Sequence, residues 1–238
     1  MMLRRLLAPV LLLVSMTACA QPSAPSAKPA AKPAARAAAP APAFIPQRGH
    51  DYELLDTPQP TWGQGKIEVA EVFSYRCIHC AEFQPKVNAW KKTMPADVRW
   101  EYVPGVFGGT WDTFARAYFA AQLMGVQPRT HDLVFKGVFV DQLVANGTAE
   151  EIAAMYAKWG VDKAKFLAAM NSFGVTAKLN RAKQFGMRSG VDGTPTLIVN
   201  GKYRVSVTPD HGFDGMLATA NWLIAQERAA ARPAAKKG

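Results

Sequence analysis

The chain has 238 residues, of which 28 are basic and 18 acidic, giving a formal net charge of +10. Ten of the basic residues lie in two acid-free ends, residues 1–48 and 228–238, so 18 basic and 18 acidic residues balance between them. Nucleic-acid binding requires a basic face on the domain itself, and this balanced count gives no indication of one, so we expect no nucleic-acid partner. The roughly 180 residues between the ends suit one domain.

Residues 1–20 have the pattern of an export signal, with a positively charged start and an apolar stretch too short to span a bilayer. Two cleavage patterns overlap at its end. The run M-T-A-C ending at Cys19 resembles a bacterial lipobox, which would leave Cys19 as a lipidated N-terminus. The run A-C-A around Cys19 fits ordinary signal peptidase, which would remove it. We therefore expect a bacterial periplasmic protein, tethered to the outer membrane under the first pattern and free under the second.

The next segment, residues 21–48, consists almost entirely of Ala, Pro, Lys, Arg and Ser. Such a composition cannot form a packed core and predicts a disordered, extended linker. Residues 231–238 form a short basic tail. The folded domain is therefore expected at residues 49–230.

A strand–helix–strand unit is expected at the start of the domain. Residues 66–75 are mostly β-branched, aromatic and apolar, which predicts a buried strand. A helix is expected from Cys77 to about Lys92, and a second strand at residues 97–103. A connection of this kind joins parallel strands, which places Cys77 where the first strand leads into the helix.

A long helical region follows. Capping residues and apolar positions at helical spacing predict five helices, at residues 111–124, 130–143, 148–159, 162–170 and 176–189. Strands return at residues 196–200 and 203–207, joined by the Asn-Gly turn at 200–201. A closing helix is expected at about residues 212–229.

The most informative motif is Cys77-Ile78-His79-Cys80, at the expected start of the first helix. Residues three apart in a helix share a face, so the two sulfurs can reach disulfide distance. The N-terminal end of the helix dipole favours a thiolate at Cys77. A bridge that closes so small a loop adds little folding stability, which favours a redox role over a structural one.

A second motif, Gly193-Thr194-Pro195, precedes the later hairpin. A proline in such a position is either an ordinary strand-edge residue or a cis-proline in a tight turn. The presence of the Cys-x-x-Cys motif in the same chain favours the cis form at Pro195.

Together these motifs resemble the DsbA-type thiol:disulfide oxidoreductases of the thioredoxin superfamily. The resemblance covers about residues 62–227 and is carried by a few features: Glu71 six positions before Cys77, the run F-S-Y-R-C-I-H-C, Pro85 in the following helix, and the late G-T-P before V-N-G-K-Y. It implies an α/β thioredoxin-like fold, with the helical stretch at about 111–189 as an inserted subdomain.

The resemblance also implies roles for individual residues. Cys77 would be the exposed nucleophile, Cys80 the buried resolving thiol, and His79 a group that stabilises the Cys77 thiolate. Thr194 and cis-Pro195 would lie against the disulfide and bind an extended substrate peptide, and Glu71 would be a buried acid that relays protons to or from Cys80.

The implied activity is donation of the Cys77–Cys80 disulfide to reduced, exported proteins, with no cofactor beyond that disulfide. A quinone-linked membrane oxidase of the DsbB type would recharge the protein, which we expect to be a monomer. Two positions depart from the commonest family pattern. Ile78 stands where proline is frequent, which points to a milder redox potential, and Gln84 stands where an acid is often found near the site.

Other interpretations were weighed. Within the enzyme class the runner-up is a disulfide isomerase or reductase, and outside it an envelope-tethered peptide-binding module with little turnover. Zinc binding would need two ligands besides the cysteines, and the four histidines show no recognisable spacing, so we expect no metal site. Ala81 excludes covalent haem attachment, which requires histidine there. His131 and His211 are expected to be surface or capping residues.

Overall fold

The computed structural model describes residues 44–231, and these form one five-stranded sheet and seven helices. The predicted signal peptide with Cys19, most of the predicted linker and all but one residue of the predicted tail lie outside the described residues. In chain order the elements are β1 (Glu53–Leu54), β2 (Ile67–Phe73), α1 (Ile78–Lys91), β3 (Val98–Pro104), α2 (Thr110–Leu123), α3 (Gln127–Phe139), α4 (Ala149–Ala157), α5 (Lys163–Met170), α6 (Phe173–Arg188), β4 (Thr196–Val199), β5 (Tyr203–Ser206) and α7 (Gly212–Ala231).

The sheet has the strand order β1–β5–β4–β2–β3. Strands β2 and β3 run parallel, which confirms the predicted strand–helix–strand unit, and the other neighbours are antiparallel. β2 lies between β3 and β4 and buries six of its seven residues, as expected for an apolar strand covered on both faces. The strand that leads to the cysteine motif is therefore an interior strand, paired with a neighbour on each side.

The β4–β5 hairpin confirms the predicted Asn-Gly turn. Asn200 and Gly201 both have positive φ, 49° and 65°, the conformation that a two-residue type I′ turn requires. The register pairs Val199 with Tyr203. Strand β1 was not predicted, because two residues are too few to show an alternating pattern.

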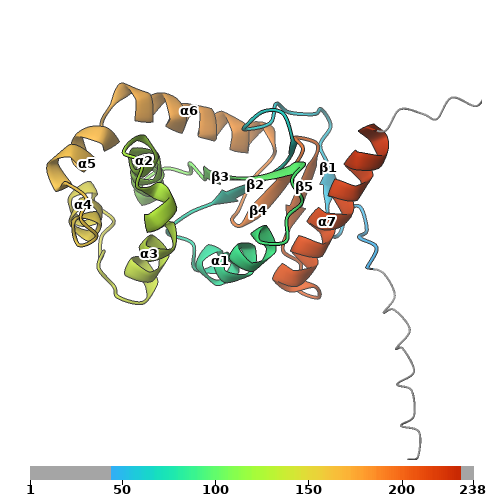
Figure 1. Cartoon of the computed structure of the whole chain (residues 1–238), viewed down its shortest axis with the longest axis horizontal. Coiled ribbons are helices and arrows are strands. Elements are labelled where there is room, and N and C mark those ends of the chain that lie inside the picture. The colour runs from blue at the N-terminus through green and yellow to red at the C-terminus, as the bar shows by residue number, and fades with distance from the viewer. Residues whose placement is uncertain (1–43, 232–238) are drawn as a thin grey trace, which may run out of the picture. The chain divides into compact units, whose positions relative to one another are not determined.

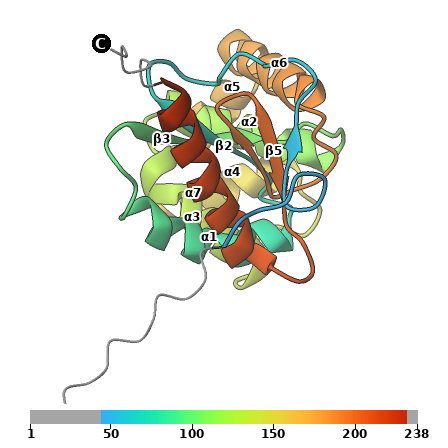
Figure 2. The same cartoon turned by 90° about the vertical axis from the view of Figure 1, so that its right-hand side faces the viewer.

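Helices α2–α6 lie between β3 and β4 in sequence; α2–α5 gather beyond one end of the sheet, and α6 runs from them back toward the strands (Figure 1). They span residues 110–188, which confirms the predicted helical insertion at about 111–189. Helix α7 crosses in front of the sheet in the view of Figure 2 and packs against β2, β4, β5 and α1.

Side-chain caps account for the starts of four helices, α1, α4, α5 and α6. Thr148 and Glu151 form the predicted capping box of α4, and Asp162 caps α5 by accepting the backbone N–H of Lys165 at 2.8 Å. Helix α6 begins at Phe173, three residues earlier than predicted, because the Ser172 hydroxyl caps it. The sequence analysis missed this start because glycine and β-branched residues in the first turn weaken the helical pattern.

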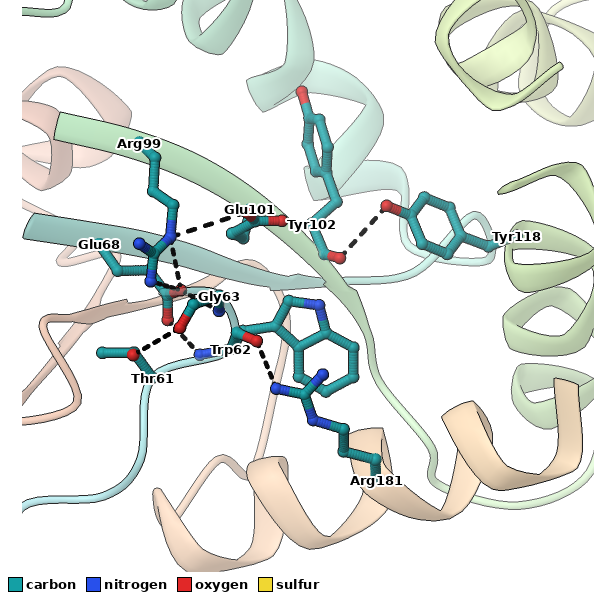
Figure 3. A network of polar contacts seen from close by, with 9 residues as sticks. All are labelled: Thr61, Trp62, Gly63, Glu68, Arg99, Glu101, Tyr102, Tyr118 and Arg181. Atoms are coloured by element: carbon teal, nitrogen blue, oxygen red, sulfur yellow. Dashed lines mark hydrogen bonds and ion pairs between the residues drawn. The ribbon is translucent and has the colours of Figure 1, made fainter. Parts of the chain in front are cut away.

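A buried ion pair joins the segment before β2 to the two parallel strands (Figure 3). The carboxylate of Glu68 is fully buried and accepts the backbone N–H groups of Trp62 and Gly63, each at 2.6 Å. Arg99 of β3 donates to the same carboxylate at 2.7 Å. The guanidinium of Arg181, from α6, lies 4.1 Å from the centre of the Trp62 ring and donates to the Trp62 carbonyl. This network connects the helical insertion to the sheet.

The described residues include 44–48, which the sequence analysis assigned to the linker. The backbone N–H of Gln47 donates to the Asp51 carboxylate at 2.8 Å, and Arg48 forms a bridge with Tyr52. These contacts place the residues within the domain rather than in the predicted linker. No helix in the range 44–231 is both long enough and apolar enough to cross a membrane.

Candidate active site

Cys77 lies in the short turn between β2 and α1. Ser74 holds this turn: its carbonyl accepts the backbone N–H of Cys77 at 3.0 Å, and its hydroxyl accepts that of Arg76 at 3.1 Å. Cys77 is the N-cap of α1, with extended backbone angles, and its sulfur accepts the backbone N–H of Cys80 at 3.4 Å. Sulfur thus occupies the position where a serine or aspartate oxygen usually caps a helix, facing its unpaired N–H groups.

The two cysteines are free thiols with opposite tendencies to ionise. A hydrogen bond from the Cys80 thiol is the largest cause that lowers the pKa of Cys77, which falls from 9.0 to about 6 against an opposing effect of burial. The backbone N–H groups of Cys80 and His79 act in the same direction. Burial raises the pKa of Cys80 far above its ordinary value. In the reduced protein Cys77 is therefore the thiol that ionises. Its exposed fraction is 8%, and Cys80 is fully buried.

Thr194 reaches the cysteine motif from a segment more than a hundred residues later. The Thr194–Pro195 peptide bond is cis, and the Thr194 carbonyl accepts a hydrogen bond from the Cys77 thiol at 3.2 Å. A thiolate has no proton to donate, so this bond exists only while Cys77 is protonated. Ionisation of Cys77 leaves the Thr194 carbonyl available to another donor.

Glu71 lies in β2 within the core, with an exposed fraction of 1%. Its Oε2 atom has no hydrogen-bond partner among the described residues. Burial, together with the charge of Cys77, raises the pKa of Glu71 to about 8, and Lys91 acts in the opposite direction. The side chain therefore holds a proton at neutral pH, because its charged form has no compensating contact.

The two residues between the cysteines face outward. The His79 ring is exposed and its Nδ1 lies 3.1 Å from Oε2 of Glu82, one turn along the helix. In this arrangement the backbone of His79, rather than its ring, acts on the Cys77 sulfur. Ile78 is 44% exposed, so it adds an apolar surface beside the reactive sulfur.

Comparison with known proteins gives the same result as the geometry. The profile of the DSBA-like thioredoxin domain matches residues 102–217. The thiol:disulfide interchange protein DsbA of Pseudomonas aeruginosa is 39% identical over 184 residues, which are 77% of this chain and 87% of that protein. The DsbA of Azotobacter vinelandii is 38% identical over 76% of this chain and 85% of its own length. The chain belongs to the DsbA family.

Solved structures agree with this assignment. The crystal structure of Pseudomonas aeruginosa DsbA has a TM-score of 0.73 at 39% identity, covering 78% of this chain and 96% of that one. The DsbA oxidoreductase of Xylella fastidiosa has a TM-score of 0.74 at 38% identity, covering 78% and 100%. These matches confirm the thioredoxin-like fold with its helical insertion. This DsbA-family protein is accordingly a thiol:disulfide oxidoreductase.

One prediction about this DsbA-family protein was wrong. His131 was expected at the surface, but it is buried in α3 behind the cysteine motif, with its Nδ1 2.8 Å from the Tyr75 hydroxyl and its Nε2 3.3 Å from Oε1 of Gln84. Burial lowers the pKa of His131 to about 3, so the ring is neutral. A signal was present in the sequence: His131 precedes the apolar positions Val134 and Phe135 at helical spacing, which places all three on the buried face.

Gln84 occupies the centre of that polar group. Its amide nitrogen, which has two hydrogens to donate, lies within hydrogen-bond distance of three acceptors: the Tyr102 hydroxyl at 2.9 Å, Asn88 at 3.1 Å and Asp132 at 3.0 Å. The position where the family often has an acid therefore carries an uncharged side chain whose amide hydrogens are both engaged in hydrogen bonds. The sequence analysis noted the substitution and did not foresee this network.

Proposed function

We propose that the protein acts as an oxidase, which donates a Cys77–Cys80 disulfide to reduced, exported polypeptides in the bacterial periplasm. The observation that carries this proposal is the unequal ionisation of the two sulfurs. Reduction of the disulfide produces a thiolate at Cys77 that the protein stabilises. Whatever stabilises the reduced form makes the disulfide a stronger oxidant.

The size of the effect follows from the pKa. A fall from 9.0 to about 6 corresponds to on the order of 4 kcal/mol of preference for the thiolate. For a two-electron couple this is on the order of 90 mV toward a more oxidising potential. The reactive thiol of a thioredoxin already has a pKa lowered to about 7. Relative to a thioredoxin, the pKa of about 6 at Cys77 therefore corresponds to roughly 30 mV toward a more oxidising potential.

The proposed reaction has two exchange steps. A substrate thiolate attacks the sulfur of Cys77, a substrate–Cys77 bond forms, the Cys77–Cys80 bond breaks, and Cys80 leaves as a thiolate. A second substrate thiolate then attacks the substrate sulfur of this mixed disulfide and displaces Cys77. The substrate has gained a disulfide, and the two electrons remain on the reduced pair. The low pKa of Cys77 makes it a good leaving group in the second step.

Cys80 needs a proton in the first step, because its thiolate would be buried. We assign its delivery to Glu71, whose raised pKa keeps the carboxyl protonated at neutral pH. The buried carboxyl influences the ionisation of both sulfurs, which suits a group that exchanges protons with the pair. We assign His79 to the stabilisation of Cys77 through its position in the first helical turn.

The substrate class follows from the surroundings of Cys77. The Thr194 carbonyl, placed beside the sulfur by the turn at cis-Pro195, can accept a backbone N–H from an extended peptide. A groove of about 360 Å³ between α1 and α3 continues from Ile78 and has Phe135 and Phe139 in its lining. A backbone acceptor beside an apolar groove suits unfolded polypeptide, with little demand on its sequence.

The reduced protein must be recharged by a partner that takes up two electrons. We propose a quinone-linked membrane oxidase of the DsbB type, attacked by the Cys77 thiolate through the same exchange chemistry. The protein would act as a monomer in the periplasm, and the lipobox-like run at Cys19 is the basis for a tether to the outer membrane.

The decisive experiment is the equilibrium between the protein disulfide and glutathione, followed by tryptophan fluorescence. We expect a potential more oxidising than that of a thioredoxin, together with rapid oxidation of a reduced test protein and poor rearrangement of scrambled disulfides. Cys77→Ser should abolish the oxidation, whereas Cys80→Ser should trap a mixed disulfide with the substrate. A thioredoxin-like potential would overturn the oxidase, and efficient rearrangement would favour an isomerase instead. Undiminished cellular function of Cys77→Ser would favour the binding module.

A further inference from the structure

A second cluster of ionisable side chains lies outside the cysteine motif, where the N-terminal segment passes the start of α7 (Figure 2). His50 and Asp51 come just before β1, and Asp210 and His211 come just before α7. Asp51 and His211 are 160 residues apart in sequence, so the fold alone brings these groups together. The proposed oxidase chemistry uses none of them.

Asp51 is the fixed centre of the cluster. Its side chain is buried, and its Oδ2 accepts the backbone N–H of Gln47 at 2.8 Å. The other oxygen, Oδ1, faces two imidazoles, with Nδ1 of His211 at 2.7 Å and Nδ1 of His50 at 3.4 Å. One donor atom from each of the three residues lies within 4.8 Å of the other two. Two ring nitrogens thus converge on a single oriented carboxylate.

Asp210 lies on the far side of the same two rings. Its Oδ2 is 3.6 Å from Nε2 of His50 and 3.5 Å from Nε2 of His211. Each imidazole is therefore placed between two carboxylates. In carboxylate–imidazole–metal sites the outer carboxylate accepts the remaining ring N–H and orients the ring, and Asp210 is placed for that task.

The His50–Asp51 distance fits a shared cation better than a direct hydrogen bond, whereas the His211–Asp51 contact is a hydrogen bond. N–H···O bonds measure about 2.7–3.2 Å, and only the His211–Asp51 contact falls within that range. Ligand atoms around a tetrahedral zinc ion, at about 2.0–2.1 Å from the metal, lie roughly 3.3 Å from one another. The His50–Asp51 separation of 3.4 Å is already close to this value. The His211–Asp51 separation of 2.7 Å is shorter, and a small rotation of the partly exposed His211 ring would lengthen it.

We propose that His50, His211 and Asp51 bind one divalent transition-metal ion, with Zn²⁺ the best match to two imidazoles and a carboxylate. The ligand atoms are the two Nδ1 atoms and Oδ1 of Asp51, and Asp210 accepts the Nε2 hydrogens. A divalent ion also balances the charge of the two carboxylates. Because both imidazoles are partly exposed, the fourth position is open to water. The bound ion would join the N-terminal segment to α7 and raise the stability of the fold.

The test is calorimetric titration of Zn²⁺ into the full chain, without a histidine tag. The protein is first oxidised and any remaining thiol is alkylated, so that sulfur cannot bind the metal. We expect one ion per chain and a rise in the melting temperature. His50→Ala, His211→Ala and Asp51→Asn should each weaken binding by more than about a hundredfold, and Asp210→Asn by about tenfold.

His79→Ala is the matched control, because it removes an exposed imidazole that has one carboxylate, Glu82, at 3.1 Å and should leave the zinc affinity unchanged. Circular dichroism checks that each variant is folded. If Asp51→Asn fails to fold, the half-exposed His50 decides the matter, since its truncation leaves the core intact. Absence of stoichiometric binding in the unmodified chain would overturn the proposal, and so would binding that survives both histidine substitutions.

Discussion

Replacement of Glu71 by glutamine tests the state of the buried acid directly. The pKa of Glu71 is raised from 4.5 to about 8 in the folded, dithiol protein. Below pH 4.5 the carboxyl is protonated in the folded and unfolded states alike, and its ionisation does not affect stability. Between pH 4.5 and 8 only the unfolded chain ionises, so the folded state loses stability as the pH rises. Above pH 8 both states are charged and the loss reaches a plateau.

The magnitude follows from the two pKa values. At pH 7 the unfolded carboxyl lies 2.5 pH units above its pKa of 4.5, while the folded one, with a pKa of about 8, is still protonated. The penalty at pH 7 is therefore about 3 kcal/mol. Glutamine has the same shape and never ionises, so Glu71→Gln should be free of this penalty. We expect its advantage over the unmodified protein to grow by about 3 kcal/mol between pH 4 and pH 7.

Urea unfolding of the reduced protein at pH 4, 5, 6, 7 and 8 measures this advantage. The difference between variant and parent is needed at each pH, because Cys77 has a lowered pKa and stabilises the fold as the pH rises. Glu53→Gln, at an exposed position in β1, is the matched control and should stay within about 0.5 kcal/mol of the parent. A difference for Glu71→Gln that does not change with pH would refute a protonated carboxyl at this site.

Three further predictions concern the remaining ionisable groups. The pKa of His131 is lowered from 6.5 to about 3, so only the unfolded chain gains a proton as the pH falls from 7 to 4. The free energy of unfolding should therefore decrease by about 3 kcal/mol over that range. His131→Gln should remove this decrease, as measured by unfolding in acid. The ultraviolet absorbance of the Cys77 thiolate should titrate near pH 6, and Cys80→Ala should raise that midpoint because the largest stabilising hydrogen bond is gone; an unchanged midpoint would contradict this cause. Glu68→Gln removes the fully buried carboxylate of an ion pair and should cost roughly 3 kcal/mol in urea unfolding, whereas Asp141→Asn, in a solvent-exposed pair, should cost less than about 1 kcal/mol; equal effects would show that burial of Glu68 is unimportant.

Most of the fold could be predicted because its signals are local. The capping box at Thr148 and the Asn200–Gly201 turn each specify a conformation within four residues, and both formed as expected. Predictions failed where a local signal was weak or was overridden. β1 was too short to show a pattern, and α6 began early because the Ser172 cap outweighed poor helix formers. The burial of His131 was missed because the residue type was given more weight than its position on the apolar face of α3.

By itself the sequence indicated the chemistry of this protein, because two thiols within one helical turn at a helix start occur in the same chain as the Gly193-Thr194-Pro195 motif and a helical insertion. Tertiary structure decided how readily each of the two thiols ionises and which other groups lie next to one another. It covered Cys80 and Glu71, and it brought the Thr194 carbonyl to within 3.2 Å of Cys77. It also placed His211 beside Asp51. Solvent exclusion and contacts across more than a hundred residues arise only when distant elements pack together, and no spacing along the chain encodes them.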